Sequence, residues 1–221
     1  MKSLEERLLH PEPGSAIAAA RDFGIDLTLL FSRLRRTPEE RFQDLQGAMA
    51  FFREIRERRG SVMINLREAL QLLVGHGVEF VIAGGVAGGI HGSSAATFDL
   101  DVCYSRDAEN LRRLVEALAP VNPRLRGAPA DLPFLWDVET LRNGFHFTLS
   151  TDVGDLDLLG DLAGLGDFLR VKAASVPWQM FGIRIAVLSL DGLITCKRAA
   201  GRPKDLLVIP ELEALREASQ G

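Results

Sequence analysis

Apolar positions change their spacing near residue 60, and this change divides the chain into two parts. Before residue 60 they recur every three or four residues, which predicts helices over 15–21 and 26–36. A third helix should begin at Thr37, which is followed by a first-turn proline and, three residues on, by Glu40. Its apolar face would be formed by Phe42, Leu45, Met49, Phe52 and Ile55. Residues 1–60 are therefore interpreted as an N-terminal helical segment that either packs on its own domain or acts as a partner-binding or self-associating arm.

After residue 60, short apolar runs alternate with helical patterns. Runs bounded by glycine or turn residues predict strands over 78–83, 98–102, 144–150, 154–159, 176–180 and 183–188. The runs at 144–150 and 154–159 can pair as a β-hairpin through a turn at 152–154. Helical spacing predicts helices over 65–73, 107–118, 166–174, 190–199 and 203–217, with a kink or split of the last one at Pro210. Prolines and glycines make 120–133 a loop by composition.

Composition limits the classes of protein that the chain could be. With 221 residues and 47% apolar content, the chain can bury a core of its own. A formal net charge of -4 argues against a protein built mainly for nonspecific coating of nucleic acid. Cys103 and Cys196 lie far apart without CxxC spacing, so neither a disulfide framework nor a structural zinc site is expected. No apolar signal core opens the chain and no apolar run is long enough to span a membrane, so we expect a soluble, cytoplasmic protein.

Carboxylates in apolar strands provide the first indication of chemistry. Asp99 and Asp101 alternate with apolar residues and should point to one face of their strand. Two like charges there are costly unless something neutralises them, usually a divalent cation. Asp157 has the same apolar setting, and Asp155 would share its face. If the hairpin pairs beside the Asp99 strand, three carboxylates converge on a site for Mg²⁺ (or Mn²⁺) rather than zinc; otherwise Asp155 and Asp157 merely border a turn.

A glycine pair ends the strand that precedes these acids. Gly84 and Gly85 come before a helix expected to start near Val86, so a phosphate could approach backbone N–H groups at the positive end of that helix. A plain tight turn is the simpler interpretation. His91, His146, Trp136 and Trp178 are interpreted as structural or packing residues.

In order and spacing, these residues resemble the nucleotidyltransferase superfamily, whose fold is shared with DNA polymerase beta. Its signature is an apolar strand ending in Gly-Gly or Gly-Ser, then an acid-x-acid strand, then a third acid on a later strand; residues 79–160 carry this order. The segment CKRAAGRPKDL extends the resemblance over 61–221, toward bacterial stand-alone nucleotidyltransferases related to AbiEii toxins of type IV toxin–antitoxin systems. The resemblance implies an α+β fold with a mixed β-sheet flanked by helices over 61–221, and the N-terminal helical extension over 1–60.

The resemblance also implies a reaction and roles for residues. A nucleoside monophosphate would pass from an NTP to an acceptor hydroxyl on RNA such as tRNA, on a protein or on a small molecule. Asp99, Asp101 and Asp157 would be the catalytic and metal-binding residues. The nucleotide-binding residues would be Gly84, Gly85, Ser93, Ser94, Lys197, Arg202, Lys204 and Asp205.

One departure from the family pattern leaves a second function open. Relatives carry an arginine in a His-Gly-x-x-Arg-x-Thr pattern before the acid-x-acid strand, and this chain has Ala95 there. The missing cation favours the alternative of a non-catalytic nucleotide-sensing or protein-interaction module on the same fold, or a replacement such as Lys197. A phosphatase of the haloacid-dehalogenase type would need a long apolar strand directly before residue 99, and 92–96 is a poor one.

Overall fold

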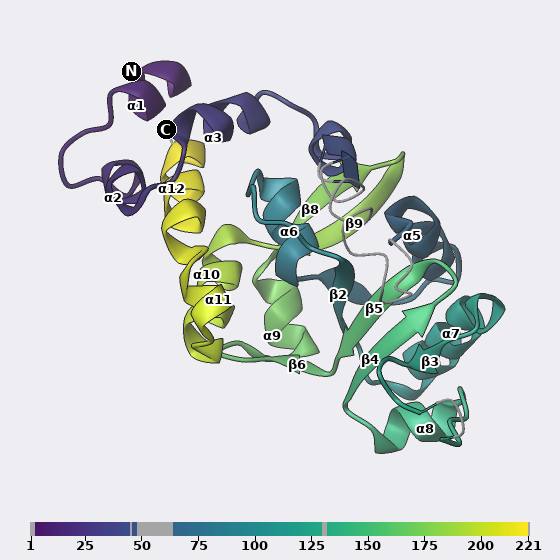
Figure 1. Ribbon diagram of the computed structural model, residues 1–221. Coiled ribbons are helices and arrows are strands. Elements are labelled where there is room, and N and C mark those ends of the chain that lie inside the picture. Colours follow the sequence, from purple (N-terminus) through teal and green to yellow (C-terminus); the bar gives the residue numbers. More distant parts are fainter. Residues whose placement is uncertain (1–2, 45, 48–63, 130–131, 221) are drawn as a thin grey trace.

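The computed structural model describes residues 3–44, 46–47, 64–129 and 132–220, and its centre is one seven-stranded sheet (Figure 1). The strand order is β3-β4-β5-β2-β1-β9-β8, with β2 parallel to β5, β1 parallel to β9, and the other neighbours antiparallel. The α+β class with a mixed sheet flanked by helices is therefore confirmed. The strands are β1 (Phe80–Ile82), β2 (Asp99–Tyr104), β3 (Arg124–Leu125), β4 (His146–Thr151), β5 (Gly154–Leu159), β8 (Ser175–Met180) and β9 (Ile183–Leu188), and two short strands, β6 (Asp161–Leu162) and β7 (Gly166–Asp167), form a small second sheet.

The two faces of β2 differ in polarity, as the alternation in the sequence predicts. Leu100 and Val102 are fully buried on one side, whereas Asp99 and Asp101 are half-buried on the other. The apolar side belongs to one continuous core that holds the sheet and its helices together. Those helices are α5 (Leu66–Gly75), α6 (Gly84–His91), α7 (Ala108–Leu118), α8 (Val138–Asn143), α9 (Phe168–Ala173), α10 (Leu190–Ala200), α11 (Pro203–Leu206) and α12 (Ile209–Ser219).

In its described residues, the N-terminal segment is helical and packs on the rest of the chain. It contains α1 (Leu4–Leu9), which the sequence did not indicate, then α2 (Ala16–Phe23) and α3 (Leu27–Leu34). The helix from Pro38 starts as predicted, because Thr37 and Glu40 exchange side-chain and backbone hydrogen bonds of 2.8 and 3.2 Å. Its further apolar positions at 45, 49, 52 and 55, and the boundary at residue 60, lie outside the described residues.

Buried and half-buried polar contacts join this segment to α12 and α6. Glu217 of α12 accepts a hydrogen bond from the backbone N–H of Ala16 at 2.6 Å. Arg33 and Arg41 are buried and donate to carbonyls at the C-terminal end of α6, those of Gly92 and Ile90. Cations at a helix C-terminus are favourable partners of its dipole. The described part of the segment is therefore packed against the helix that carries the glycine pair.

Three local predictions need correction. The 120–133 loop contains a 3₁₀ turn (Ala119–Val121) and the edge strand β3, which composition concealed because prolines and glycines flank so short a strand. Helix α6 begins at Gly84, two residues earlier than expected. The helix expected after Pro203 is split in two, but the break lies before Pro210, between α11 and α12. Pro210 lies in the first turn of α12, where its missing N–H costs no helical hydrogen bond. Helix α8 and strands β6 and β7 were not predicted. Within the described residues, no helix combines the length and apolarity needed to cross a bilayer.

Candidate functional site

Four carboxylates lie on one face of two adjacent strands. Strands β2 and β5 pair in parallel with Asp99 opposite Asp155 and Asp101 opposite Asp157. Because paired residues on neighbouring strands project to the same side, the expected convergence of the third acid on the first two takes place. Asp155 joins them and also accepts a hydrogen bond from the Ser150 hydroxyl at 2.8 Å.

Arg126, which sequence reasoning missed, lies among these carboxylates. Its backbone N–H donates to the carbonyl of Thr148, which extends β3 along β4. Its guanidinium lies 2.7 Å from Asp157, 3.1 Å from Asp155 and 3.6 Å from Asp99. A signal was available, since Arg124-Leu125-Arg126 alternates polar and apolar side chains, as an edge strand does. The acids therefore have a cationic partner that comes from another strand.

Asp101 is the carboxylate that Arg126 does not reach. Burial, reinforced by the neighbouring charges of Asp99 and Asp157, raises the pKa of Asp101 to about 7. Lys197 and the backbone N–H of Gly85 act in the opposite direction. Burial also raises the pKa of Asp157, although Arg126 partly offsets it. Carboxyl groups held this far from their ordinary pKa are typical of functional sites.

The glycine pair is required by the contact between α6 and the acid strand. Gly84 has a φ of +59°, and a Cβ there would lie 1.8 Å from a carboxylate oxygen of Asp101. A Cβ on Gly85 would lie 2.4 Å from the Cβ of Thr97, whose hydroxyl donates to Asp99 at 3.1 Å. Only glycine allows the start of α6 to come this close to the acids.

A second set of charged side chains lies on α10 and at the start of α11. Asp205 is 1% exposed and accepts hydrogen bonds from Lys197, at 2.8 Å, and from Arg202. Burial alone would raise the pKa of Asp205, but these two hydrogen bonds outweigh it and lower the pKa. The charges of Lys197 and Arg202 both act on Asp101. We call Lys197, Arg202 and Asp205 the basic cluster, and the structure places it beside the acids.

The remaining predicted site residues are held elsewhere. The buried carboxylate of Glu211 on α12 accepts from the hydroxyls of Ser93 and Ser94, at 2.6 Å each, and from the Ser94 backbone N–H at 2.7 Å. Lys204 is exposed, and no contact within the described residues joins it to the acids. Both serines therefore tie the loop after α6 to α12.

Both histidines have the structural surroundings expected of them. The ring of half-buried His91 lies 2.9 Å from the carbonyl of Leu188 and packs edge-on against Trp178. Burial lowers the pKa of His91, which favours its neutral form. His146 lies near the surface, 3.3 Å from Asp161 of β6.

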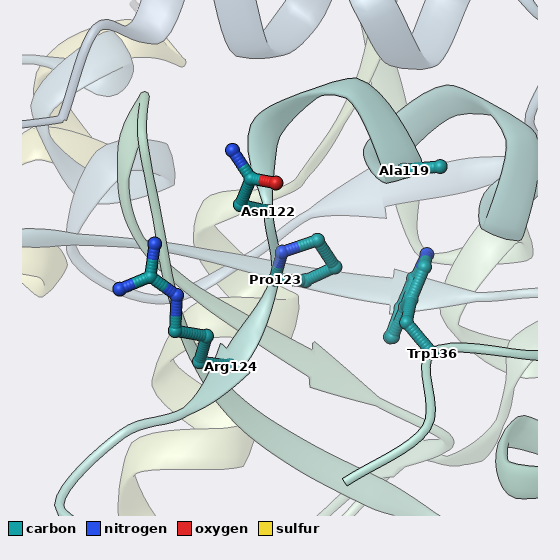
Figure 2. A pocket seen from close by; sticks show the side chains of 5 residues that line it. All are labelled: Ala119, Asn122, Pro123, Arg124 and Trp136. Atoms are coloured by element: carbon teal, nitrogen blue, oxygen red, sulfur yellow. The ribbon is translucent and has the colours of Figure 1, made fainter. Parts of the chain in front are cut away.

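A hollow of about 330 Å³ lies at the outer end of β3, apart from the acids. Figure 2 shows its lining side chains: Ala119, Asn122, Pro123, Arg124 and Trp136. The indole N–H of Trp136 donates to the carbonyl of Val115 at 3.0 Å, which anchors the ring as a packing residue. Arg124 is two positions before Arg126 and is 74% exposed.

The acids suit a hard divalent cation in kind but not in their present arrangement. Carboxylate oxygens are the donors that Mg²⁺ and Mn²⁺ prefer. Yet in the described part of the chain no three carboxylate, imidazole or thiol groups are arranged so as to hold a metal ion. The guanidinium of Arg126 lies among Asp99, Asp155 and Asp157 instead.

Comparisons with known proteins add little to this geometry. No protein-family model and no curated protein matches the chain. Among solved structures, the chain is similar to a protein from Thermotoga maritima whose crystal structure bears the name "putative nucleotidyltransferase", with 18% identity and a TM-score of 0.41. The match covers 72% of this chain and 96% of the other. A likeness at this level carries no argument about function, and the interpretation of the site rests on its own residues.

Proposed function

We propose that the protein is a metal-dependent nucleotidyltransferase, which moves a nucleoside monophosphate from an NTP to an acceptor hydroxyl on RNA, a protein or a small molecule and releases pyrophosphate. The observation that carries this proposal is the register of β2 and β5, which sets Asp101 opposite Asp157 beside the basic cluster. A surface that combines excess carboxylates with adjacent cations suits a metal-bound polyphosphate better than a neutral ligand.

Each part of the site has a distinct task in this proposal. The metal, Mg²⁺ or Mn²⁺ held by Asp99, Asp101 and Asp157, would supply charge neutralisation at the phosphates. Lys197 and Arg202 bind the phosphate oxygens, and Asp205 keeps both cations in place. The N-terminal end of α6 favours negative charge, and Gly84 and Gly85 leave room for a phosphate to approach its backbone. Asp157 orients the attacking hydroxyl. Ser93 and Ser94 have no part in it, because their hydroxyls donate to Glu211.

The test is transfer of label from each α-³²P-labelled NTP to components of a cell extract in the presence of Mg²⁺. Wild type should label an acceptor, and Asp99→Ala and Asp101→Ala should lower the rate by roughly a hundredfold or more, since each removes a charge that the reaction needs. Asp22→Ala is the matched control, because Asp22 is exposed on α2 and pairs with exposed Arg21. Absence of labelled product, or equal labelling by the acid variants, would contradict the proposal.

A non-catalytic nucleotide sensor is the second candidate, and the ion pairs of Arg126 favour it. An arginine that offsets part of the charge of the acids reduces the need of a folded module for a metal. Calorimetry with Mg-NTP, combined with the transfer assay, separates the two: a sensor binds nucleotide and transfers nothing.

We extend the first proposal to a role like that of AbiEii-type toxins, with residues 1–60 as the contact for a protein partner or a second copy. Leu9, Phe23 and Leu29 are exposed apolar side chains in the described part of that segment. A toxin-like enzyme should arrest growth when expressed, and Asp101→Ala should not. Growth arrest by both forms, or by neither, would count against this extension.

A further inference from the structure

The guanidinium of Arg126 takes the position at which the acids of β2 and β5 come closest to one another. One nitrogen, Nη2, lies 2.7 Å from Asp157 Oδ1 and 3.6 Å from Asp99 Oδ2, so it bridges the third acid and the first. The other terminal nitrogen, Nη1, lies 3.1 Å from Asp155 Oδ2. The side chain of Arg126 is 26% exposed and that of Asp155 is 11% exposed, so water screens these pairs only in part.

These contacts differ from those of a structural arginine in the same fold. Arg106 donates to the carbonyls of Leu141, Gly144 and Arg142, which is how an arginine fastens a loop. The guanidinium contacts described for Arg126 are all with carboxylates. A side chain bound in this way serves to neutralise charge.

One guanidinium does not balance the charge around it. The site holds Asp99, Asp101, Asp155 and Asp157 together with the basic cluster, in which two cations surround one carboxylate. With every group ionised, the site has five carboxylates, the four on the sheet and Asp205, against three cations, which are Arg126, Lys197 and Arg202. The carboxylates therefore outnumber the cations by two. A divalent cation would supply that difference, but it needs oxygen atoms that the guanidinium now contacts.

The backbone at Arg126 lies at the edge of the sheet. Strand β3 is a two-residue edge strand, and Arg126 adds one further hydrogen bond to Thr148. Gly127, with a φ of +77°, follows directly. The Ser150 hydroxyl donates to Asp155 Oδ1, the carboxylate oxygen other than the one that Arg126 contacts.

From this geometry we infer that Arg126 is a built-in competitor for the cation site. In the ligand-free protein it bridges Asp99, Asp155 and Asp157, and a divalent cation binds after the guanidinium has moved away. The inference rests on the proposed function, because it takes the same acids as the metal ligands. It adds a residue from outside the signature motifs that sets how tightly the cation is bound.

The experiment is a titration of the metal-free full chain with Mn²⁺, followed by electron paramagnetic resonance of the free ion. Arg126→Ala should bind Mn²⁺ about tenfold or more tightly than wild type, because the competing cation is gone. Arg124→Ala is the matched control: it removes an exposed arginine of the same strand, and its affinity should equal that of wild type. Arg126→Gln keeps the side chain as far as Cδ, removes the charge, and replaces the alanine variant if that variant does not fold.

A measurement on the unaltered protein accompanies the titration. The side-chain Nη–H signals of Arg126 should be protected from exchange with water in EDTA, because Nη1 and Nη2 contact the acids, and should lose this protection when diamagnetic Mg²⁺ is added. Equal or weaker Mn²⁺ affinity in Arg126→Ala would overturn the inference and leave the proposed function standing. If neither wild type nor the variant binds Mn²⁺, the metal-dependent function fails together with it.

Discussion

The acids of the sheet and the basic cluster of α10 and α11 solve opposite electrostatic problems. On the sheet, a single guanidinium is shared by Asp99, Asp155 and Asp157, and Asp101 is left with a pKa of about 7. In the basic cluster, one buried carboxylate, Asp205, accepts from two cations. The first region lacks positive charge and the second has a surplus. The comparison shows that neither region balances its own charge. In the proposed function, a divalent cation would complete the first region and a polyphosphate would pair with the second.

The largest expected effect comes from breaking the basic cluster. Asp205→Ala should lower the free energy of unfolding by roughly 3 kcal/mol, because it leaves Lys197 and Arg202 facing each other without their buried partner. Urea unfolding measures the change. Asp191→Ala removes an exposed carboxylate that pairs with Arg216, and it should cost roughly 0.5 kcal/mol or less. A similar cost for both variants would show that the cluster does not depend on Asp205.

Gly84→Ala tests how closely the start of α6 is packed against the acids of the sheet. A Cβ at this position meets Asp101 at 1.8 Å, and the φ of +59° adds strain. We expect a loss of roughly 2–3 kcal/mol in urea unfolding. Gly182→Ala shares the positive φ, of +75°, but meets nothing within 4 Å, so it should cost roughly 1 kcal/mol. Equal losses of unfolding free energy in the two variants would mean that the contact with Asp101 does not make glycine necessary at position 84.

Lys197→Ala tests whether the surplus positive charge of the basic cluster contributes to binding of the nucleotide. The KM for the NTP should rise about tenfold, since the lysine contacts phosphate in the proposed complex. Arg198→Ala, on the same helix and paired with Glu213 at the surface, should leave the KM unchanged. Initial rates of label transfer give both constants, and an unchanged KM in both variants would separate the basic cluster from substrate binding.

The smallest expected effect is a dependence of stability on pH. The pKa of Asp101 is raised from an ordinary value of 3.8 to about 7 in the folded protein. Between those values the folded state binds the extra proton, so the contribution of Asp101 to stability is greatest at low pH and falls as the pH rises toward 7. In EDTA, Asp101→Asn should remove this fall and be more stable than wild type at pH 8 by roughly 1–2 kcal/mol. If the unfolding free energies of wild type and Asp101→Asn changed with pH in parallel, that result would contradict the raised pKa of Asp101.

Much of this arrangement could be predicted from local patterns. Alternation around Asp99 and Asp157 identified two strands with carboxylates on one face, since the strand period of two is visible in a few residues. Capping signals located the helices that begin after Thr37 and Asp107. Gly84 and Gly85 were interpreted as leaving room for a phosphate or as a tight turn, and neither interpretation indicated their close contacts with Asp101 and Thr97.

The remainder depends on contacts between segments far apart in the sequence. The pairing of β2 with β5 sets the register of the acids, and no local pattern fixes which strands become neighbours. Arg126 escaped notice because a two-residue edge strand among prolines and glycines has too little alternation to stand out from a loop. The partnership of Ser93 and Ser94 with Glu211 spans more than a hundred residues, so the serines looked available for phosphate.

A crystal structure with Mg²⁺ and a nonhydrolysable NTP tests the central claim most directly. The account predicts the metal on Asp99, Asp101 and Asp157, the triphosphate against Lys197 and the start of α6, and Arg126 moved away from the acids. A nucleotide bound elsewhere, with Arg126 still bridging Asp99 and Asp157, would contradict it.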